Sequence, residues 1–394
     1  MFILVLVVIT AVCFDFTNGF HDTANAVATS IATGALKPRV AVAMAAVLNL
    51  VGAFISIKVA ATIAKGIVNP TSLEHGSGLS LVFAALIGAI IWNLITWYFT
   101  LPSSSSHALI GGIIGATIAA EGSHNVMFHG VVASVIAPGI MSPIIAFGVA
   151  VIGTFFVYRL IRLLGEGAAR RGYRYGQIGS AALVSLAHGT NDAQKTMGVI
   201  TLALIAHGSI SANHFYVPLW VKLVCACAIA AGTFIGGWRI INTMGNRITE
   251  IESPQGFSAE AASAAVILSS SYYGYPLSTT HVVSGGVMGA GAGKRLESVH
   301  WGVFGQMLTA WVFTIPMAAA FGAATWEVAN LFGSNSSVGV LVMAIVAAFA
   351  AAGLFTLAQR NKIGAHDLDR THIPPEREAE VGPPSAAPAE VGAA

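Results

Sequence analysis

Two short polar motifs that could bind a cation lie inside otherwise apolar stretches of this 394-residue chain. Residues 19–25 read Gly-Phe-His-Asp-Thr-Ala-Asn, and residues 189–195 read Gly-Thr-Asn-Asp-Ala-Gln-Lys. A carboxylate in hydrocarbon is costly unless a cation compensates its charge. We therefore predict that Asp22 and Asp192 bind a coupling cation, Na⁺ or H⁺. The alternative is that each aspartate is an ordinary hydrogen-bonded core residue.

A cluster of hydroxyl side chains that ends in a histidine follows each motif. Residues 103–106 are four serines before His107, and residues 278–280 are Ser-Thr-Thr before His281. If each cluster opens a helix, its hydroxyl groups and free backbone N–H groups form a phosphate-sized anion cradle. Simple N-capping is the alternative, but recurrence after both motifs favours an anion site. The two histidines then either bind the anion or stabilise the surrounding turn.

Other polar residues of the motifs complete the predicted cation site. Gly19 and Gly189 are expected to let each helix unwind and expose backbone carbonyl groups. Lys195 occupies the position that matches Asn25 in the first motif. We hypothesise that Lys195 pairs with Asp192 where a metal ion would otherwise sit, favouring proton coupling or transport of a neutral metal–phosphate species. Neutral oxygen ligands are available from Asn18, Asn25, Asn191 and Gln194. The predicted cation-coupling residues are Asp22, Asp192, Lys195 and Asn191.

The motifs and clusters recur in the same order, which indicates an internal duplication. Asp192 follows Asp22 by 170 positions, and the second cluster follows the first at nearly the same spacing. Each cluster lies between a longer and a shorter apolar segment, as expected for a re-entrant hairpin that turns near mid-membrane. The glycine pairs at 111–112 and 285–286 would let the two limbs of each hairpin approach closely.

The composition indicates a membrane protein with many spans. Of the residues, 55% are hydrophobic and only 9% are charged, and the mean hydropathy is +0.76. Apolar stretches long enough for a membrane helix, about 20 residues, recur along the chain, whereas the alternation of a β-barrel does not. We expect Cys13, Cys225 and Cys227 to be small core residues, and the first apolar stretch to be a true helix rather than a signal peptide.

Basic residues predict the orientation of the spans. The densest basic run, residues 159–174, is expected to be cytoplasmic, because Lys and Arg in short loops remain on that side. The remaining basic residues then place the N-terminus outside and the C-terminus in the cytoplasm. Each half has three crossings and one hairpin, and the halves have opposite orientations. Inverted repeats with broken helices are typical of secondary transporters, which bind substrate near mid-membrane.

The predicted fold is all-α and polytopic, with inverted-topology repeats, broken helices, two re-entrant hairpins and about 10–12 membrane segments. A single transport domain is expected over residues 1–358, followed by a disordered cytoplasmic tail over 359–394. Within the domain we expect repeat one at about 1–163, a basic cytoplasmic loop at about 159–177, repeat two at about 178–331 and an extra helix at about 338–357.

The motif sequences at residues 19–29 and 188–198 resemble the paired signature of the inorganic phosphate transporter (PiT) family. The resemblance covers residues 1 to about 357. It implies a secondary transporter that is driven by a cation gradient and holds phosphate between its two re-entrant hairpins. Carried over by position, the resemblance points to Asp22, Asn25, Asp192, Ser104, Ser105, Ser106, Ser278, Thr279 and Thr280.

The chain departs from the sodium-coupled pattern of that family, which resembles Gly-Ala-Asn-Asp-Val-Ala-Asn in both repeats. Here His21 stands in the first motif and Gln194-Lys195 in the second. The departure resembles the bacterial low-affinity branch, which implies phosphate uptake with protons, often as a metal–phosphate complex. We therefore predict a proton-coupled phosphate symporter of the bacterial plasma membrane rather than an enzyme.

Several alternatives remain open at the level of sequence. They are a Na⁺-coupled phosphate symporter, a sulfate permease of the same fold, a passive anion channel and an intramembrane hydrolase that uses Ser106 and His107. The hydrolase is disfavoured because adjacent residues on a helix do not face each other. The expected partners are inorganic phosphate, H⁺ or Na⁺, a divalent metal carried with phosphate, the lipid bilayer and a second copy in a homodimer. We expect no cofactor, no resident metal and no nucleic acid.

Overall fold

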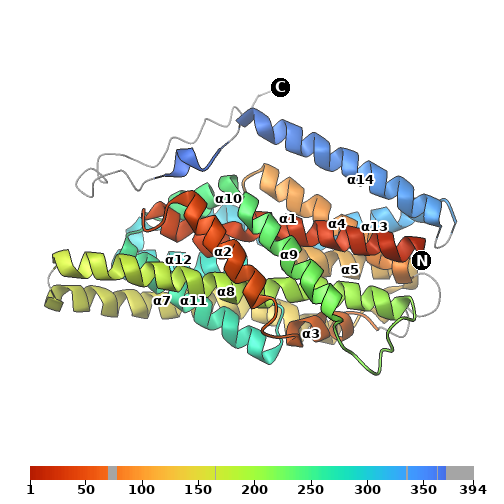
Figure 1. Ribbon diagram of the computed structural model, residues 1–394, viewed down its shortest axis with the longest axis horizontal. Helices are drawn as coiled ribbons and strands as arrows, with labels where there is room; N and C mark the ends of the chain where they lie inside the picture. The colour runs from red at the N-terminus through yellow and green to blue at the C-terminus, as the bar shows by residue number, and fades with distance from the viewer. Residues whose placement is uncertain (70–77, 165, 334–335, 362, 370–394) are drawn as a thin grey trace.

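The computed structural model describes residues 1–69, 78–164, 166–333, 336–361 and 363–369, and it is built from helices. Figure 1 shows long helices lying along the longest axis of the molecule, with α14 along one side. The helices are α1 (Phe2–Ala32), α2 (Pro38–Gly52), α3 (Lys58–Gly66), α4 (Gly78–Tyr98), α5 (Ser105–Glu121), α6 (Phe128–Val131), α7 (Ala137–Leu164), α8 (Glu166–Ala206), α9 (Leu219–Ile235), α10 (Trp238–Asn242), α11 (Ser253–Tyr273), α12 (Thr279–Lys294), α13 (Trp301–Asn330) and α14 (Ser337–Ala358).

By length and composition, five of the described helical stretches could cross a membrane. A sixth is added if α9 and the stretch Trp238–Arg247, which meet at a bend of 62°, form one broken span. This multi-span, all-helical architecture confirms the predicted fold class at that level. The remaining helices of the expected 10–12 segments are either shorter, as are α5 with 17 residues and α12 with 16, or more polar.

The helices that carry the two motifs are continuous, so the expected unwinding at their glycines is wrong. Gly19 lies within α1 and Gly189 within α8. A Cβ at Gly19 would lie 2.3 Å from the carbonyl oxygen of Ile229 on α9, and a Cβ at Gly189 would lie 2.3 Å from that of Asn49 on α2. The two glycines therefore allow close packing of helix backbones, not exposure of carbonyl groups.

Matching elements of the two halves make matching contacts. Helix α1 packs against α9, and its counterpart α8 packs against α2. Helix α5 packs against α13, and its counterpart α12 packs against α7. Figure 1 shows α1 and α8 running in opposite directions, from right to left and from left to right respectively. Each half thus contributes helices that pack against the other half.

The glycine pairs in α5 and α12 allow the close approach that the sequence predicts. A Cβ at Gly112 would lie 2.2 Å from the carbonyl oxygen of Ala85 on α4, and one at Gly286 would lie 2.9 Å from that of Ala259 on α11. The neighbouring glycines Gly111 and Gly285 instead contact α13 and α7. Each short helix is therefore held tightly on two sides.

The basic segment expected to be a loop is helical. Helices α7 and α8 extend through residues 159–164 and 166–177, and together they form the projection at the left of Figure 1. Arg174 on α8 donates a hydrogen bond to the carbonyl oxygen of Gly34, 3.2 Å away. Because long helices satisfy their own backbone groups, this basic segment needs no irregular structure.

The beginning of the expected tail also has structure. The predicted extra helix corresponds to α14, but short 3₁₀ helices follow it at Gln359–Asn361 and His366–Leu368. The side chain of Leu368 is buried in a hydrophobic cluster, so this part of the chain packs against the bundle instead of leaving it. The rest of the expected tail, residues 370–394, lies outside the described residues.

Replacing Gly112 with Ala tests whether close backbone approach holds α5 in place. Gly148→Ala in α7 is the matched control, because a Cβ there meets nothing within 4 Å. Both changes favour a helix by about 1 kcal/mol, but overpacking at position 112 should lower the free energy of unfolding by about 1–3 kcal/mol. Thermal melting in detergent measures the difference. Equal melting temperatures of the two variants would contradict this account.

Candidate functional site

The N-terminal ends of α5 and α12 meet in the interior of the bundle. Ser104 caps α5 by accepting a hydrogen bond from the backbone N–H of His107 at 3.1 Å, and Ser278 caps α12 through His281 at 3.2 Å. The hydroxyl of Ser106 donates to the carbonyl oxygen of Leu277, 3.2 Å away, which joins the two helix ends. All of the predicted hydroxyl residues are buried, and two positive helix ends therefore point into one buried region.

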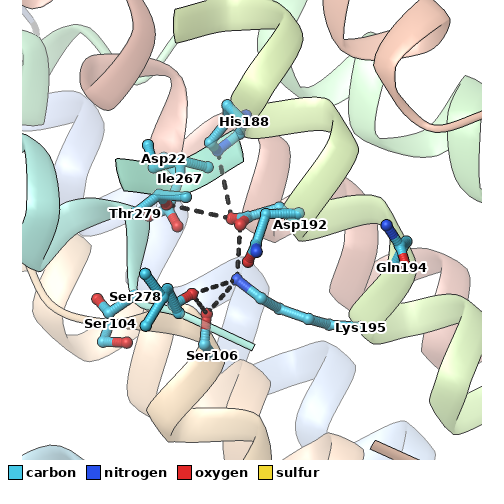
Figure 2. A network of polar contacts seen from close by, with 12 residues as sticks. Asp22, Ser104, Ser106, His188, Asp192, Gln194, Lys195, Ile267, Ser278 and Thr279 are labelled. Carbon is cyan, nitrogen blue, oxygen red and sulfur yellow. Dashed lines mark hydrogen bonds and ion pairs between the residues drawn. The ribbon is translucent and has the colours of Figure 1, made fainter. Parts of the chain in front are cut away.

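Lys195 reaches this junction from α8. Its ammonium group donates to a carboxylate oxygen of Asp192 at 2.6 Å, to the carbonyl oxygen of Leu277 at 2.8 Å and to the hydroxyl of Ser106. Figure 2 shows the lysine extending from α8 toward Ser106 and Ser278. The ammonium has three N–H donors, and all three have oxygen partners. The predicted pairing of Lys195 with Asp192 is thus present, directly beside both clusters.

Asp192 has further partners on its second carboxylate oxygen. Thr279 lies 3.3 Å from this oxygen, and the Nε2 atom of His188 also lies 3.3 Å from it. His188 precedes Asp192 by four residues, so the two side chains share one face of α8. Asp192 therefore links the α8 motif to the second hydroxyl cluster.

Asp22 is linked to the first cluster through neighbouring side chains. The Nδ1 atom of His21 lies 2.7 Å from its carboxylate, and Nε2 of the same ring lies 3.3 Å from the hydroxyl of Thr96. Thr96 and Ser103 are hydrogen-bonded at 2.7 Å. The first motif thus reaches the first cluster through two uncharged hydroxyl groups.

Asn25 connects the first motif with the second cluster. Its amide nitrogen donates to the hydroxyl groups of Thr279 at 3.2 Å and Thr280 at 3.0 Å. Ser105 is buried beside this junction, and its hydroxyl has no hydrogen-bond partner among the described residues. A buried, unpaired hydroxyl is unfavourable unless a ligand or water occupies the site. The predicted substrate-binding residues therefore gather in one buried region.

A possible cation-binding set lies next to the junction. Asp22, His188 and Asp192 each offer one ligand atom, these atoms lie within 4.8 Å of one another, and all three residues are buried. One imidazole and two carboxylates form a donor set that suits divalent transition metals. No resident metal is expected from the sequence, and His188 is not among the predicted site residues, although its spacing of four residues from Asp192 could have identified it.

Other predicted ligands lie outside this junction. Asn191 donates to the hydroxyl of Ser271 at 2.9 Å and to the carbonyl oxygen of Tyr275 at 3.2 Å, so its amide nitrogen holds the segment before α12. Gln194 accepts hydrogen bonds from the first backbone N–H groups of α3, at Val59 and Ala60, and Figure 2 shows it pointing away from the junction. Its carbonyl oxygen is therefore used in capping a helix.

The two cluster histidines contact each other. The ring centroids of His107 and His281 lie 4.8 Å apart, and His281 stacks on Trp311 at 4.0 Å. Trp311 in turn donates to the carbonyl oxygen of Pro102 at 3.0 Å, just before the first cluster. The ring contacts support the interpretation that these histidines stabilise the meeting of the two short helices.

Comparison with known proteins gives consistent matches over most of the chain. Residues 18–169 and 162–322 match the sequence model of the Phosphate transporter family. A protein of Mycobacterium bovis named probable low-affinity inorganic phosphate transporter is 57% identical over 333 residues, which are 84% of this chain and 79% of that protein. A protein of the same name from Bacillus subtilis is 48% identical, over 83% of this chain and 97% of that protein.

The fold is also similar to that of a solved structure. This structure, titled the sodium-dependent phosphate transporter, superposes with a TM-score of 0.73 at 25% sequence identity. The match covers 84% of this chain and 100% of the other. The helical arrangement described above is therefore one that a transporter uses.

Replacing Lys195 with Met tests whether its ammonium compensates the buried charge of Asp192. The change should lower the free energy of unfolding by about 3–5 kcal/mol, because it leaves a carboxylate buried without its cation. Lys294→Met is the matched control: Lys294 pairs with Glu252 at 2.8 Å where both are partly exposed, so its loss should cost at most about 1 kcal/mol. Thermal melting in detergent measures both.

The double variant Asp192→Asn/Lys195→Met separates charge from packing. It should recover much of the stability lost in the single Lys195 variant, because no uncompensated carboxylate remains. A double variant no more stable than the single one would show that Asp192 does not carry the uncompensated charge.

Proposed function

Since the chain belongs to the phosphate transporter family, we propose that this multi-pass membrane protein is a symporter that carries inorganic phosphate together with H⁺. The observation that carries the proposal is the junction of two helix N-termini, two hydroxyl clusters and the Lys195 ammonium in one buried region. Helix N-termini and hydroxyl groups donate hydrogen bonds to phosphate oxygens, and a nearby ammonium group compensates part of the negative charge of the anion.

The donors divide into two groups in this proposal. Ser105, Ser106, Thr279 and Thr280 present hydroxyl groups to phosphate, and Asn25 positions the two threonines through its amide nitrogen. Ser104 and Ser278 act through the helix ends that they cap, which fixes the direction of the free backbone N–H groups. The site thus uses both hydroxyl clusters, one from each half.

The same geometry favours phosphate over sulfate. At neutral pH phosphate carries a proton that it can donate, whereas sulfate has none. Asp192 lies 3.3 Å from Thr279 and can accept a hydrogen bond from a phosphate bound beside that residue. Sulfate would instead place its oxygens against a carboxylate, which is repulsive.

The pairing of Lys195 with Asp192 supports coupling to H⁺ rather than to Na⁺. A covalently attached ammonium occupies the position where a metal ion could otherwise compensate Asp192. The set of Asp22, His188 and Asp192 could hold the divalent ion of a metal–phosphate cargo. In that case the metal is transported with the substrate and is not a resident cofactor.

We further propose that the two halves form an inverted repeat with the N-terminus outside and the C-terminus in the cytoplasm. The opposite directions of α1 and α8 in Figure 1 support this arrangement, as do the matched contacts of α5 with α13 and of α12 with α7. The substrate would then lie where the hairpins of both halves meet, which is typical of secondary transporters.

Reconstitution into vesicles tests the function directly. Uptake of labelled phosphate should speed up when the vesicle interior is more alkaline, collapse with a protonophore and show no dependence on a Na⁺ gradient. Parallel assays with Mg²⁺ or Zn²⁺ test transport of the metal complex. Uptake driven by a Na⁺ gradient alone would instead indicate a Na⁺ symporter. Equal competition by sulfate would indicate a sulfate permease, and no accumulation of phosphate against a gradient would indicate a channel.

Replacing Lys195 with Asn tests its role in the choice of cation. Asn removes the ammonium that compensates Asp192, so phosphate uptake by the variant should become stimulated by Na⁺. Lys195→Arg keeps the charge and should remain indifferent to Na⁺. The comparison requires uptake in equal concentrations of sodium and choline chloride. A Lys195→Asn variant that loses transport and remains indifferent to Na⁺ would refute the role.

A further inference from the structure

Glu260 is a buried carboxyl group outside both motifs. It is the eighth residue of α11, and only 2% of the residue is accessible to solvent. Thr29 on α1 donates to one of its oxygens, and Ser180 on α8 donates to the other at 2.5 Å. The carboxyl group therefore joins α11 to both of the helices that carry the motifs.

The surroundings of Glu260 differ from those of the motif aspartates. Asp22 contacts an imidazole and Asp192 contacts an ammonium group, whereas Glu260 forms no ion pair within the part of the chain that the structure describes. Its partners are uncharged hydroxyl groups. An ionised carboxylate buried with neutral partners alone is costly, so this environment favours the protonated group.

The ionisable groups of the helices packed against α11 have other partners or lie at the surface. On α8, Tyr173 packs against Phe257, Arg174 donates to the carbonyl oxygen of Gly34, and His188 and Lys195 contact Asp192.

On α7, Tyr158 donates to Glu252, and Arg159 and Arg162 are exposed. On α12, Lys294 pairs with Glu252, and His281 contacts Gly139 and Trp311. On α1 and α3, Asp22 contacts His21, and Lys58 donates to the carbonyl oxygen of Tyr272.

We propose that Glu260 is the residue that binds and releases the coupling proton. The assignment rests on the proposed function and adds a proton site to it. The hydroxyl groups of Thr29 and Ser180 can each donate or accept a hydrogen bond. They can donate to the ionised carboxylate, and either can accept from the protonated carboxyl group. The site can therefore satisfy both protonation states, with one proton gained from water on one side and released to water on the other.

The position of Glu260 couples this proton to the substrate site. Thr29 follows Asn25 by four residues, so it lies one turn further along the same face of α1. Ser180 precedes His188 by eight residues, about two turns along α8. Asn25 in turn donates to Thr279 and Thr280. Loss of the proton leaves an uncompensated carboxylate charge between α1, α8 and α11. Water must reach the carboxyl group before the proton can leave. Proton release therefore requires these helices to separate.

Replacing Glu260 with Gln tests the assignment in vesicles that contain the full-length protein. Gln keeps the size and hydrogen bonding of a protonated carboxyl group but cannot release a proton. The pH gradient should therefore no longer drive phosphate accumulation, with initial uptake lowered by about tenfold or more. Exchange of labelled for unlabelled phosphate at equal pH should persist within about twofold, because it needs no net proton movement. Glu297→Gln, which removes an exposed carboxylate, is the matched control.

A second variant addresses the case in which Glu260→Gln does not fold. Thr29→Val removes a hydroxyl donor that stabilises the ionised carboxylate more than the neutral one, because hydrogen bonds to charged groups are stronger. The proton is then released only at higher pH, so the pH of half-maximal uptake should shift upward. An unchanged pH profile of Thr29→Val, or undiminished gradient-driven uptake by Glu260→Gln, would overturn the assignment of Glu260 but not the proposed proton coupling. If the unmodified protein ignores the pH gradient, the proposed proton coupling itself fails.

Discussion

A buried ammonium group held between two helix N-termini is the interaction on which the rest of the site depends. Lys195 places its three N–H donors on Asp192, Ser106 and the carbonyl oxygen of Leu277. These partners come from α8, from the start of α5 and from the segment before α12. Because a buried ammonium tolerates no unpaired donor, the arrangement forms only when all three elements are in place.

The charge balance at this junction gives a physical reason for the proposed coupling of phosphate to a cation. Two helix N-termini and one ammonium group favour negative charge there, and the carboxylate of Asp192 already supplies one negative charge. If phosphate binds at this junction as proposed, Lys195 must compensate both the carboxylate and the anion. A second cation, whether a proton or a metal ion, then lowers the free energy of the loaded site.

The halves of the protein are matched in packing but differ in chemistry. Asn25 on α1 reaches the second hydroxyl cluster, and Lys195 at the matching position on α8 reaches the first. Glu260 has no acidic counterpart in the first half. Gly112 contacts Ala85 and the matching Gly286 contacts Ala259, so Ala259 corresponds to Ala85 and Glu260 corresponds to Leu86. A duplicated scaffold thus supplies the two opposed helix ends, while individual substitutions supply the charges that make the site asymmetric.

The sequence by itself determined the helical membrane architecture, the buried aspartates and the two hydroxyl clusters, because burial of polar groups in apolar segments is visible in composition and spacing. Only the tertiary structure decided how they meet. It kept the helices continuous at Gly19 and Gly189, turned Gln194 toward α3 and placed His188 beside Asp192. It also placed Glu260 between Thr29 and Ser180. Contacts between residues far apart in the chain depend on how helices cross, which local sequence patterns do not specify.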